Sequence, residues 1–297
     1  MHHRAVTYSI VARDPTSGEL GVAVQSRSFN TGAACAWAEA GVGAVATQSF
    51  TERRYGPRGL ALLAEGREPR EALDELLAAD ESRAIRQVAF VDVHGATAVH
   101  TGTSCIPHAG DLAAENVSVQ GNMLRSADVW PAMGEAFDST AGTLAERLLA
   151  ALDAAEAAGG DYRGRQGAGL VVVSGEPDEQ PSVDRVFDLR VEDHEEPLQE
   201  LRRLHRLAAG YRRRNRIDET ADPDEEREAA LEAGLREDEA AMAALFAHAR
   251  RGEVDEAVGL IRQLVDAEPM PLTAFERYEA LGLVPPGVLD AVRQRSG

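Results

Sequence analysis

Short apolar strands follow one another in groups along this sequence, and the helices between them come in pairs. Residues 7–12 and 20–24 alternate in polarity on either side of the turn at 14–18 (DPTSG), which predicts an opening hairpin, and a third strand is expected at 43–47. The regular strand–helix alternation of a parallel sheet is missing. The order therefore favours an α+β fold in which antiparallel sheets are layered and flanked by helices.

Helical spacing and turn residues place the remaining elements of this first part. The expected helices are 57–65, 70–79, 128–137 and 143–158, and the expected strands are 87–93, 97–101, 117–120, 168–173 and 185–191. The fourth helix is expected to start behind Thr140 and to stop at Gly159-Gly160. His94-Gly95 is expected to form a hairpin turn.

Beyond Glu195 the sequence is almost purely helical and strongly acidic. Residues 218–228 carry seven carboxylates in eleven positions, which predicts a linker and a boundary near residue 218. Residues 218–297 hold 19 acidic and 8 basic residues. The C-terminal region therefore carries most of the excess negative charge of the chain.

One segment of this acidic region, 243–269, resembles a single tetratricopeptide-like helix pair. Because solenoids need about three repeats, a small helical cap is favoured over a partner-binding module. The expected domains are an extension at 1–6, an α+β domain at 7–217 and an acidic helical region at 218–297.

The charge of the chain limits its partners. Its 297 residues include 50 acidic and 31 basic ones, a formal charge of −19, and all 31 basic residues are arginine. Such a chain repels nucleic-acid backbones and anionic membrane surfaces, so neither is an expected partner. The absence of lysine excludes a Schiff-base lysine, a phosphate-loop lysine and a Ser–Lys pair.

Cysteine and histidine usage points to neither a disulfide nor a metal. Cys35 and Cys105 lie far apart, and no apolar run has the length of a signal peptide or a membrane span, so a reduced, cytoplasmic protein is expected. Five potential metal ligands lie close together in the sequence, but their spacing matches no known metal site: His94, His100, Cys105, His108 and Asp111. Dinucleotide and nucleoside-triphosphate motifs are also missing. We therefore expect no metal and no cofactor.

Seven segments of the sequence point to one family. They are 7–14 (TYSIVARD), 21–26 (GVAVQS), 40–48 (AGVGAVATQ), 55–57 (YGP), 105–107 (CIP), 119–124 (VQGNML) and 160–166 (GDYRGRQ). In this order they resemble the DUF1028 family, a group of unknown activity placed in the N-terminal-nucleophile (Ntn) hydrolase superfamily, over about residues 7–212. The resemblance implies a four-layer αββα sandwich with a helical C-terminal tail. By superfamily analogy it implies hydrolysis of an amide bond.

The resemblance makes Thr7 the candidate nucleophile. Ntn hydrolases use Ser, Thr or Cys as the first residue of the mature chain, whose α-amine, with a pKa of about 7.7–8.0, accepts the proton of the nucleophile. Without the resemblance, Thr7 is simply a β-branched residue that opens a strand. Ser9 faces the same side of that strand and is a neighbouring or fallback hydroxyl. Asn122, after Gly121, is expected to stabilise the oxyanion, with turn formation as the competing interpretation.

Six residues, Met1–Val6, precede Thr7 in this sequence. Three explanations stay open: translation starts at Val6, whose GTG codon can initiate; a propeptide is removed by attack of Thr7 on the Val6 carbonyl; or the extension stays and the site is inactive. The first is favoured because the extension shows no strand or helix signal.

Further polar residues are expected around a substrate: Gln25, Arg27, Gln48, Asp161, Arg163 and Gln166. The guanidinium forks of the arginines match a substrate carboxylate. The competing interpretations are an internal ion-pair cluster in the loop 160–166, a solvated arginine at a strand end and ordinary turn residues. Cys105 paired with His108 is a remote alternative nucleophile.

The sequence thus predicts a metal-free, Ntn-type amidohydrolase that cleaves a C–N bond in a small amide or peptide-like metabolite, with Thr7 as nucleophile. The alternative is a catalytically inactive Ntn-fold scaffold whose helical tail recruits a partner. A homodimer is the commonest arrangement of soluble oligomers, and the sequence leaves the oligomeric state open.

Overall fold

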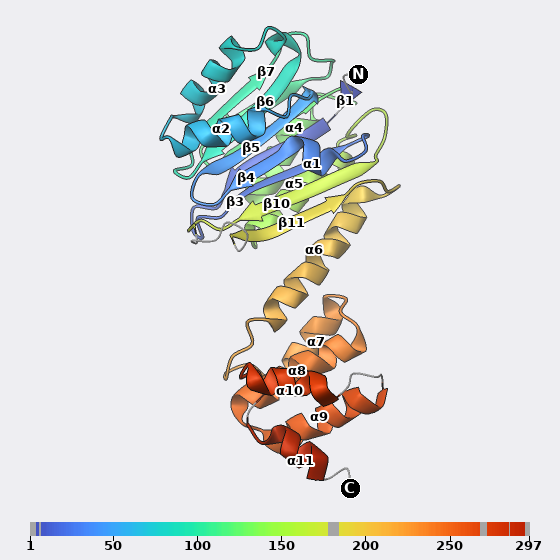
Figure 1. Ribbon diagram of the computed structural model, residues 1–297. Coiled ribbons are helices and arrows are strands. Elements are labelled where there is room, and N and C mark those ends of the chain that lie inside the picture. Colours follow the sequence, from blue (N-terminus) through green and yellow to red (C-terminus); the bar gives the residue numbers. More distant parts are fainter. Residues whose placement is uncertain (1–3, 6, 178–183, 268–271, 285, 295–297) are drawn as a thin grey trace. The chain divides into compact units, whose positions relative to one another are not determined.

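The structure is a computed structural model that describes residues 4–5, 7–177, 184–267, 272–284 and 286–294 (Figure 1). The chain divides into two compact units, one up to Arg202 and the other from Arg203 onward. Each unit has its own buried apolar clusters. No helix among the described residues is long and apolar enough to cross a membrane.

Two antiparallel sheets form the centre of the first unit. The first sheet has the order β1-β5-β6-β7, with β4 also paired to β5, and consists of β1 (Arg4–Ala5), β4 (Ala36–Glu39), β5 (Gly43–Phe50), β6 (Arg86–Asp92) and β7 (Thr97–Thr101). The second has the order β11-β10-β3-β2-β9-β8 and consists of β2 (Thr7–Arg13), β3 (Leu20–Ser26), β8 (Gly110–Ala114), β9 (Val117–Asn122), β10 (Gly167–Val173) and β11 (Arg185–Val191). Every described pairing of these strands is antiparallel, which confirms a mixed α/β fold with layered antiparallel sheets.

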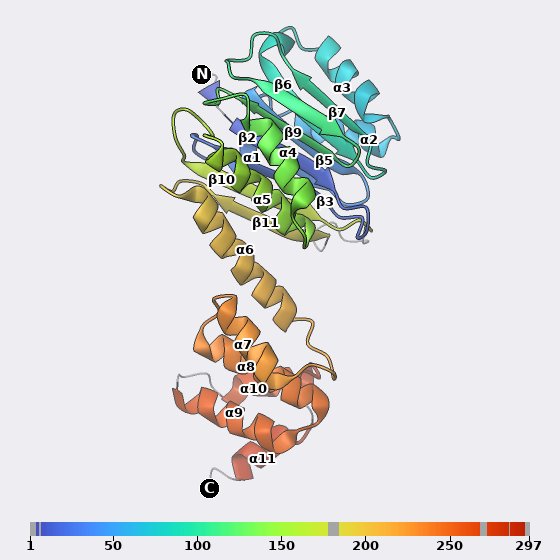
Figure 2. The same cartoon turned by 180° about the vertical axis from the view of Figure 1, so that it is seen from behind.

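Helices cover the outer face of each sheet. The helices α2 (Tyr55–Ala64) and α3 (Pro69–Ala78) pack on the first sheet, and α4 (Val129–Ser139) and α5 (Leu144–Ala157) pack on the second (Figures 1 and 2). The inner faces of the two sheets meet in an apolar cluster that includes Val11, Val22, Ala44, Ala89 and Val91. The first unit therefore has the layer order helices, sheet, sheet, helices.

Local signals account for the element bounds. The strands β7 and β11 have the expected bounds, because alternation and turn residues are local features. Helix α5 (expected at 143–158) begins one residue later than expected, and its N-cap is Thr143, which forms a capping box with Glu146, where the sequence suggested Thr140. In the turn at His94-Gly95, the Asp92 carboxylate accepts from two backbone N–H groups, and Gly95 has a φ of 90°.

Four short elements escape the sequence patterns. They are β1, β4, β8 and α1 (Thr31–Cys35). β8 (GDLAA) lies at the edge of its sheet with mostly exposed residues, so it lacks an alternating apolar pattern. The expectation that the extension before Thr7 has no regular structure is wrong for Arg4–Ala5, which pair with Phe50 and Ser49.

The second unit is built of helices. They are α6 (Pro197–Arg214), which contains the division between the units, α7 (Pro223–Glu232), α8 (Glu237–Arg251), α9 (Val254–Ala267), α10 (Leu272–Ala280) and α11 (Val288–Gln294). The division lies upstream of the boundary expected near 218 because Leu207 and Tyr211 pack with Ala230 and Leu235. The acidic segment 218–228 is not wholly a linker: Asp222 caps α7, whose first turn is acidic, as the helix dipole favours.

A glycine contact tests the packing of the first unit. A Cβ on Gly169 would lie 2.6 Å from the Cα of Gly32, and neither backbone has room to move aside. We expect Gly169→Ala to lower the stability of this unit by about 1–3 kcal/mol in thermal unfolding. The control is Gly134→Ala inside α4, where the new Cβ makes an ordinary 3.5 Å contact and is expected to add about 0.5–1 kcal/mol. Equal melting temperatures for the two variants would contradict the packing described.

Candidate active site

The interface between the two sheets changes from apolar to polar toward one end. At this end the polar inner-face residues include Thr7 and Ser9 on β2, Ser26 on β3, Gln48 on β5, Gln87 on β6, and Gln120 and Asn122 on β9. Two residues further along their strands, Val24, Ala46 and Ala89 belong to the apolar cluster. All of the polar residues are at most 1% exposed. The sheets thus enclose a buried polar cluster at the end where β2 begins.

Strand register explains why these residues meet. Thr7 lies opposite Ser26 on one side and opposite Asn122 on the other. Gln48 lies opposite Gln87 in the first sheet. Residues directly opposite each other on antiparallel strands share a face, so the two sheets present these side chains to one another.

Four hydrogen bonds close a ring between the two sheets. The carbonyl oxygen of Thr7 accepts from Gln48 Nε2 at 3.1 Å and from Asn122 Nδ2 at 3.5 Å. Gln87 Oε1 accepts from the same two amide nitrogens, at 2.8 and 2.9 Å. Thr7 and Asn122 belong to the second sheet and Gln48 and Gln87 to the first. This ring, called the amide ring below, ties the sheets together at their polar end.

The hydroxyl of Thr7 lies among neutral groups. Thr7 Oγ1 donates to Ser26 Oγ at 3.2 Å. The neighbouring Ser9 Oγ accepts from Gln120 Nε2 at 3.2 Å. Hydroxyl and amide groups do not take up a proton near pH 7. The side chains that hydrogen-bond Thr7 in the described part of the chain therefore include no base.

Gln87 is the residue of the amide ring that the sequence did not indicate. Its Nε2 lies within hydrogen-bond distance of Thr101 Oγ1 and of the carbonyl oxygens of Gly110 and Gly121, at 2.9–3.1 Å. A glutamine directly before the apolar run Val88–Val91 of a buried strand is the local signal that marks it. Ser26 and Gln120 were also missed, because single polar residues near strand ends are common.

Gln25 lies on the other side of the second sheet from Thr7. It pairs with Tyr8, whose hydroxyl donates to Glu156 on α5 at 2.7 Å, so Gln25 faces the helix layer. Its side chain is fully buried, and both amide atoms lack a hydrogen-bond partner among the described residues. Neighbouring residues of a strand point to opposite faces, which separates Gln25 from the cluster.

Asp161 and Arg163 form an internal ion pair behind the end of β3. The buried Asp161 carboxylate accepts from the backbone N–H of Arg27 at 2.9 Å and from that of Arg163 at 2.8 Å. The Arg163 guanidinium lies 3.1 Å from it. Burial raises the pKa of Asp161 above its ordinary value, although the bonds from Arg163 and Arg27 oppose the shift.

Arg27 keeps its charge available at the same strand end. Its guanidinium donates to Gln166 Oε1 at 3.0 Å, a neutral partner, while Gln166 Nε2 donates to Asp193 at 3.0 Å. Arg27 follows Ser26, the residue opposite Thr7, and is exposed. Among the sequence-predicted binding residues, it is the exposed cation next to the polar cluster.

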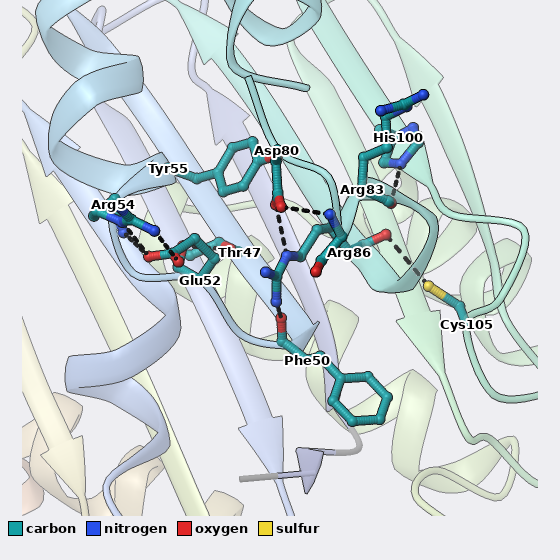
Figure 3. Close-up of polar contacts among 11 residues, drawn as sticks. Thr47, Phe50, Glu52, Arg54, Tyr55, Asp80, Arg83, Arg86, His100 and Cys105 are labelled. Atoms are coloured by element: carbon teal, nitrogen blue, oxygen red, sulfur yellow. Dashed lines mark hydrogen bonds and ion pairs between the residues drawn. The ribbon is translucent and has the colours of Figure 1, made fainter. Parts of the chain in front are cut away.

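A second polar cluster occupies the opposite face of β6 from Gln87. Figure 3 shows Arg86 bonded to Asp80 at 2.7 Å and to the Phe50 carbonyl, with the Tyr55 hydroxyl 3.2 Å from Asp80. Cys105 Sγ donates to the Arg86 carbonyl at 3.3 Å. Burial raises the pKa of the Cys105 thiol, which disfavours the nucleophilic thiolate. These contacts support a structural role for this cluster.

Cys35 is likewise buried, and burial raises the pKa of its thiol to about 12. His100 Nε2 lies 2.9 Å from the Arg83 carbonyl (Figure 3). In the part of the chain that the structure describes, no group of three or more His, Cys, Asp or Glu side chains is placed to hold a metal ion.

Comparison with known proteins assigns the family. Residues 7–201 match the family of unknown function DUF1028. This chain belongs to the DUF1028 family. The crystal structure of protein SPO2555 from Silicibacter pomeroyi, also described as DUF1028, is 32% identical over 69% of this chain and 89% of that chain, with a TM-score of 0.62. Among proteins with curated descriptions, no match is found.

The amide ring of this DUF1028 domain leads to a stability prediction. Gln87→Met keeps the size of the side chain but leaves the Gln48 and Asn122 amides without their shared acceptor, so we expect a loss of about 1–3 kcal/mol in chemical unfolding. Gln25→Met is the matched control, because that buried glutamine has no described partner to lose and is expected to be neutral or stabilising. Equal free energies of unfolding for the two variants would show that the amide ring does not stabilise the domain.

Proposed function

We propose that this DUF1028 protein is an Ntn-type amidohydrolase that cleaves a C–N bond in a small amide metabolite, with Thr7 as nucleophile and its α-amine as base. The observation that carries the proposal is the setting of Thr7. Among the described residues, only neutral side chains hold its hydroxyl and carbonyl at the polar end of the sheet interface. A nucleophilic hydroxyl needs a base, and the α-amine of Thr7 supplies one only in a chain that begins there.

The proposed reaction proceeds through an acyl-enzyme. Thr7 Oγ bonds to the amide carbon while its proton passes to the Thr7 α-amine. The negative charge on the former carbonyl oxygen is stabilised by the Asn122 side-chain amide, which already donates to a carbonyl oxygen in the amide ring. The C–N bond breaks as the leaving amine takes the proton from the α-ammonium. Water, deprotonated by the α-amine, then cleaves the ester to release the acid and restore Thr7.

Three unsatisfied groups support a ligand site at this cluster. Gln48 Oε1, Gln120 Oε1 and Asn122 Oδ1 are buried and have no hydrogen-bond partner among the described residues. Most buried polar atoms in proteins are paired, and exceptions concentrate at functional sites. A substrate amide N–H is a suitable donor to such oxygens, and exposed Arg27 is a suitable anchor for a substrate carboxylate.

Access to Thr7 depends on the residues ahead of it. Thr7 is fully buried, and Arg4–Ala5 pair with Phe50 and Ser49, directly beyond Gln48 on β5. A chain that begins at Thr7 lacks this short strand. Its loss would free the α-amine and uncover the end of β5 beside the amide ring. A single change would thus provide both the base and access for the substrate.

Three forms of the protein test the mechanism on a panel of small amides and N-acyl compounds. We expect the form beginning at Thr7 to be active, and the form beginning at Met1 and Thr7→Ala in the short form to be inactive. Because the base must be unprotonated, kcat/KM should rise with pH through about 7.7–8.0, the range of an α-amine. Ser9→Ala is the matched control, a hydroxyl on the same face that should leave activity intact. Equal activity of all three forms would remove the N-terminal mechanism.

A second prediction concerns the oxyanion. In the active form, Asn122→Ala should lower kcat by about 10²–10³-fold with little change in KM, because the donor acts mainly in the transition state. Gln87→Met breaks the same amide ring without removing that donor. If Gln87→Met lowers kcat as much as Asn122→Ala, the effect is one of structure and Asn122 is not the oxyanion donor.

The alternative function is an inactive scaffold with this fold, and one observation favours it: Thr7 is buried, and in a chain that keeps residues 1–6 its nitrogen is a peptide nitrogen. N-terminal sequencing and intact mass of the protein from its native source distinguish the two. A first residue Thr7 supports the hydrolase, and a retained Met1 supports the scaffold.

A further inference from the structure

The second unit contains a groove of about 470 Å³ along one face of α8. Asp238, Met242, Phe246 and Arg250 line it at intervals of four residues, so they form one stripe of that helix. The volume lies within the range of about 300–1,000 Å³ that is typical of small-molecule sites. The groove is formed by this unit alone and is independent of the proposed chemistry at Thr7.

The floor of the groove is apolar and aromatic. Met242 and Phe246 come from α8, and Tyr278 and Leu283 come from α10 and the turn that follows. Phe246 and Tyr278 pack edge to face, with ring centroids 5.9 Å apart and an angle of 87° between the planes. Ile217 closes the floor from the segment after α6. Such a surface favours the hydrocarbon part of a ligand.

Three arginines surround this apolar floor. Arg236 is occupied, since it bonds Asp238 and Glu239, the two acidic residues of the lining. Arg214 and Arg250 form no ion pair among the described residues. The Arg214 guanidinium lies over the Tyr211 ring, 4.9 Å from its centroid, and its buried Nε has no hydrogen-bond partner among those residues. Two guanidinium groups therefore remain for a ligand.

The location of these arginines is notable because of the charge around them. The second unit, residues 203–297, holds 19 acidic and 14 basic residues. Arg214 and Arg250 nevertheless line the apolar groove without an ion pair among the described residues, although the charge of Arg214 helps to lower the pKa of Glu239, which also lines it. The planar fork of a guanidinium matches a carboxylate. The negative charge of the unit and the acidic residues of the lining oppose a polyanion.

We infer that this groove binds a small organic monocarboxylate with an apolar body, such as a medium-chain or arylalkyl acid. The carboxylate lies between Arg214 and Arg250, and the hydrocarbon lies on Phe246, Tyr278 and Met242. A nucleotide or an oligophosphate does not fit this groove, because its negative charge exceeds the positive charge of the two arginines.

Calorimetric titration of the full chain with octanoate tests the inference, with acetate as the head group alone and octanol as the body alone. We expect octanoate to bind saturably and at least about tenfold more tightly than either, because both parts contribute. Arg214→Gln and Arg250→Gln should each weaken octanoate by about tenfold. Arg277→Gln is the control, a residue on α10 that does not line the groove. Thermal unfolding of each variant checks that the unit remains folded.

Several results would overturn the inference. They are no octanoate binding, equal binding of acetate and octanoate, equal binding of octanol and octanoate, or equal weakening by Arg277→Gln. A peptide that ends in a free phenylalanine carboxylate is the final comparison. If it binds where octanoate does not, the groove receives protein termini and the small-molecule assignment is wrong.

Discussion

The amide ring joins the two sheets through one backbone carbonyl and three side-chain amides, all of them buried. An unpaired buried amide costs about 1–3 kcal/mol, so the ring is favourable only when both sheets hold their partners in place. A register shift of one residue in β2 or β5 would turn Thr7 or Gln48 to the outer face. The register of four strands therefore depends on the same set of hydrogen bonds.

Outside the amide ring, the first unit is held together by apolar packing. Toward the other end of the interface, Val11, Val22 and Ala89 fill the space between the sheets, while α2 to α5 cover the outer faces. Burial of apolar surface stabilises the unit without specifying one register as narrowly as paired amides do. The polar end adds specificity but leaves Gln48 Oε1 and Asn122 Oδ1 without described partners. That combination of rigid support and unsatisfied groups is what a preorganised site requires.

The second unit follows a different principle. Its helices are stabilised by caps such as Asp222 and by an apolar cluster around Phe275 and Ile261. Its 19 acidic residues outnumber its 14 arginines, so exposed arginines there have carboxylates to pair with. Arg214 and Arg250 are exceptions to that pairing, and both lie at the groove along α8. The two arginines without an ion pair and the hollow in the surface thus lie at the same place, the groove along α8.

Local sequence features were sufficient for the class of the fold and for most element positions. Turn residues, caps and two-residue alternation act within a few positions, so the bounds of β7 and β11 follow from the letters alone. Thr7, Gln48 and Asn122 were also found from local position and family resemblance. Short elements such as α1 and β8 bury too few apolar residues to produce a pattern. The partners of Thr7 needed the folded chain, because pairing between strands distant in sequence sets which side chains share a face. That pairing puts Gln87 into the ring and turns Gln25, adjacent to Ser26 in the chain, toward the helices instead.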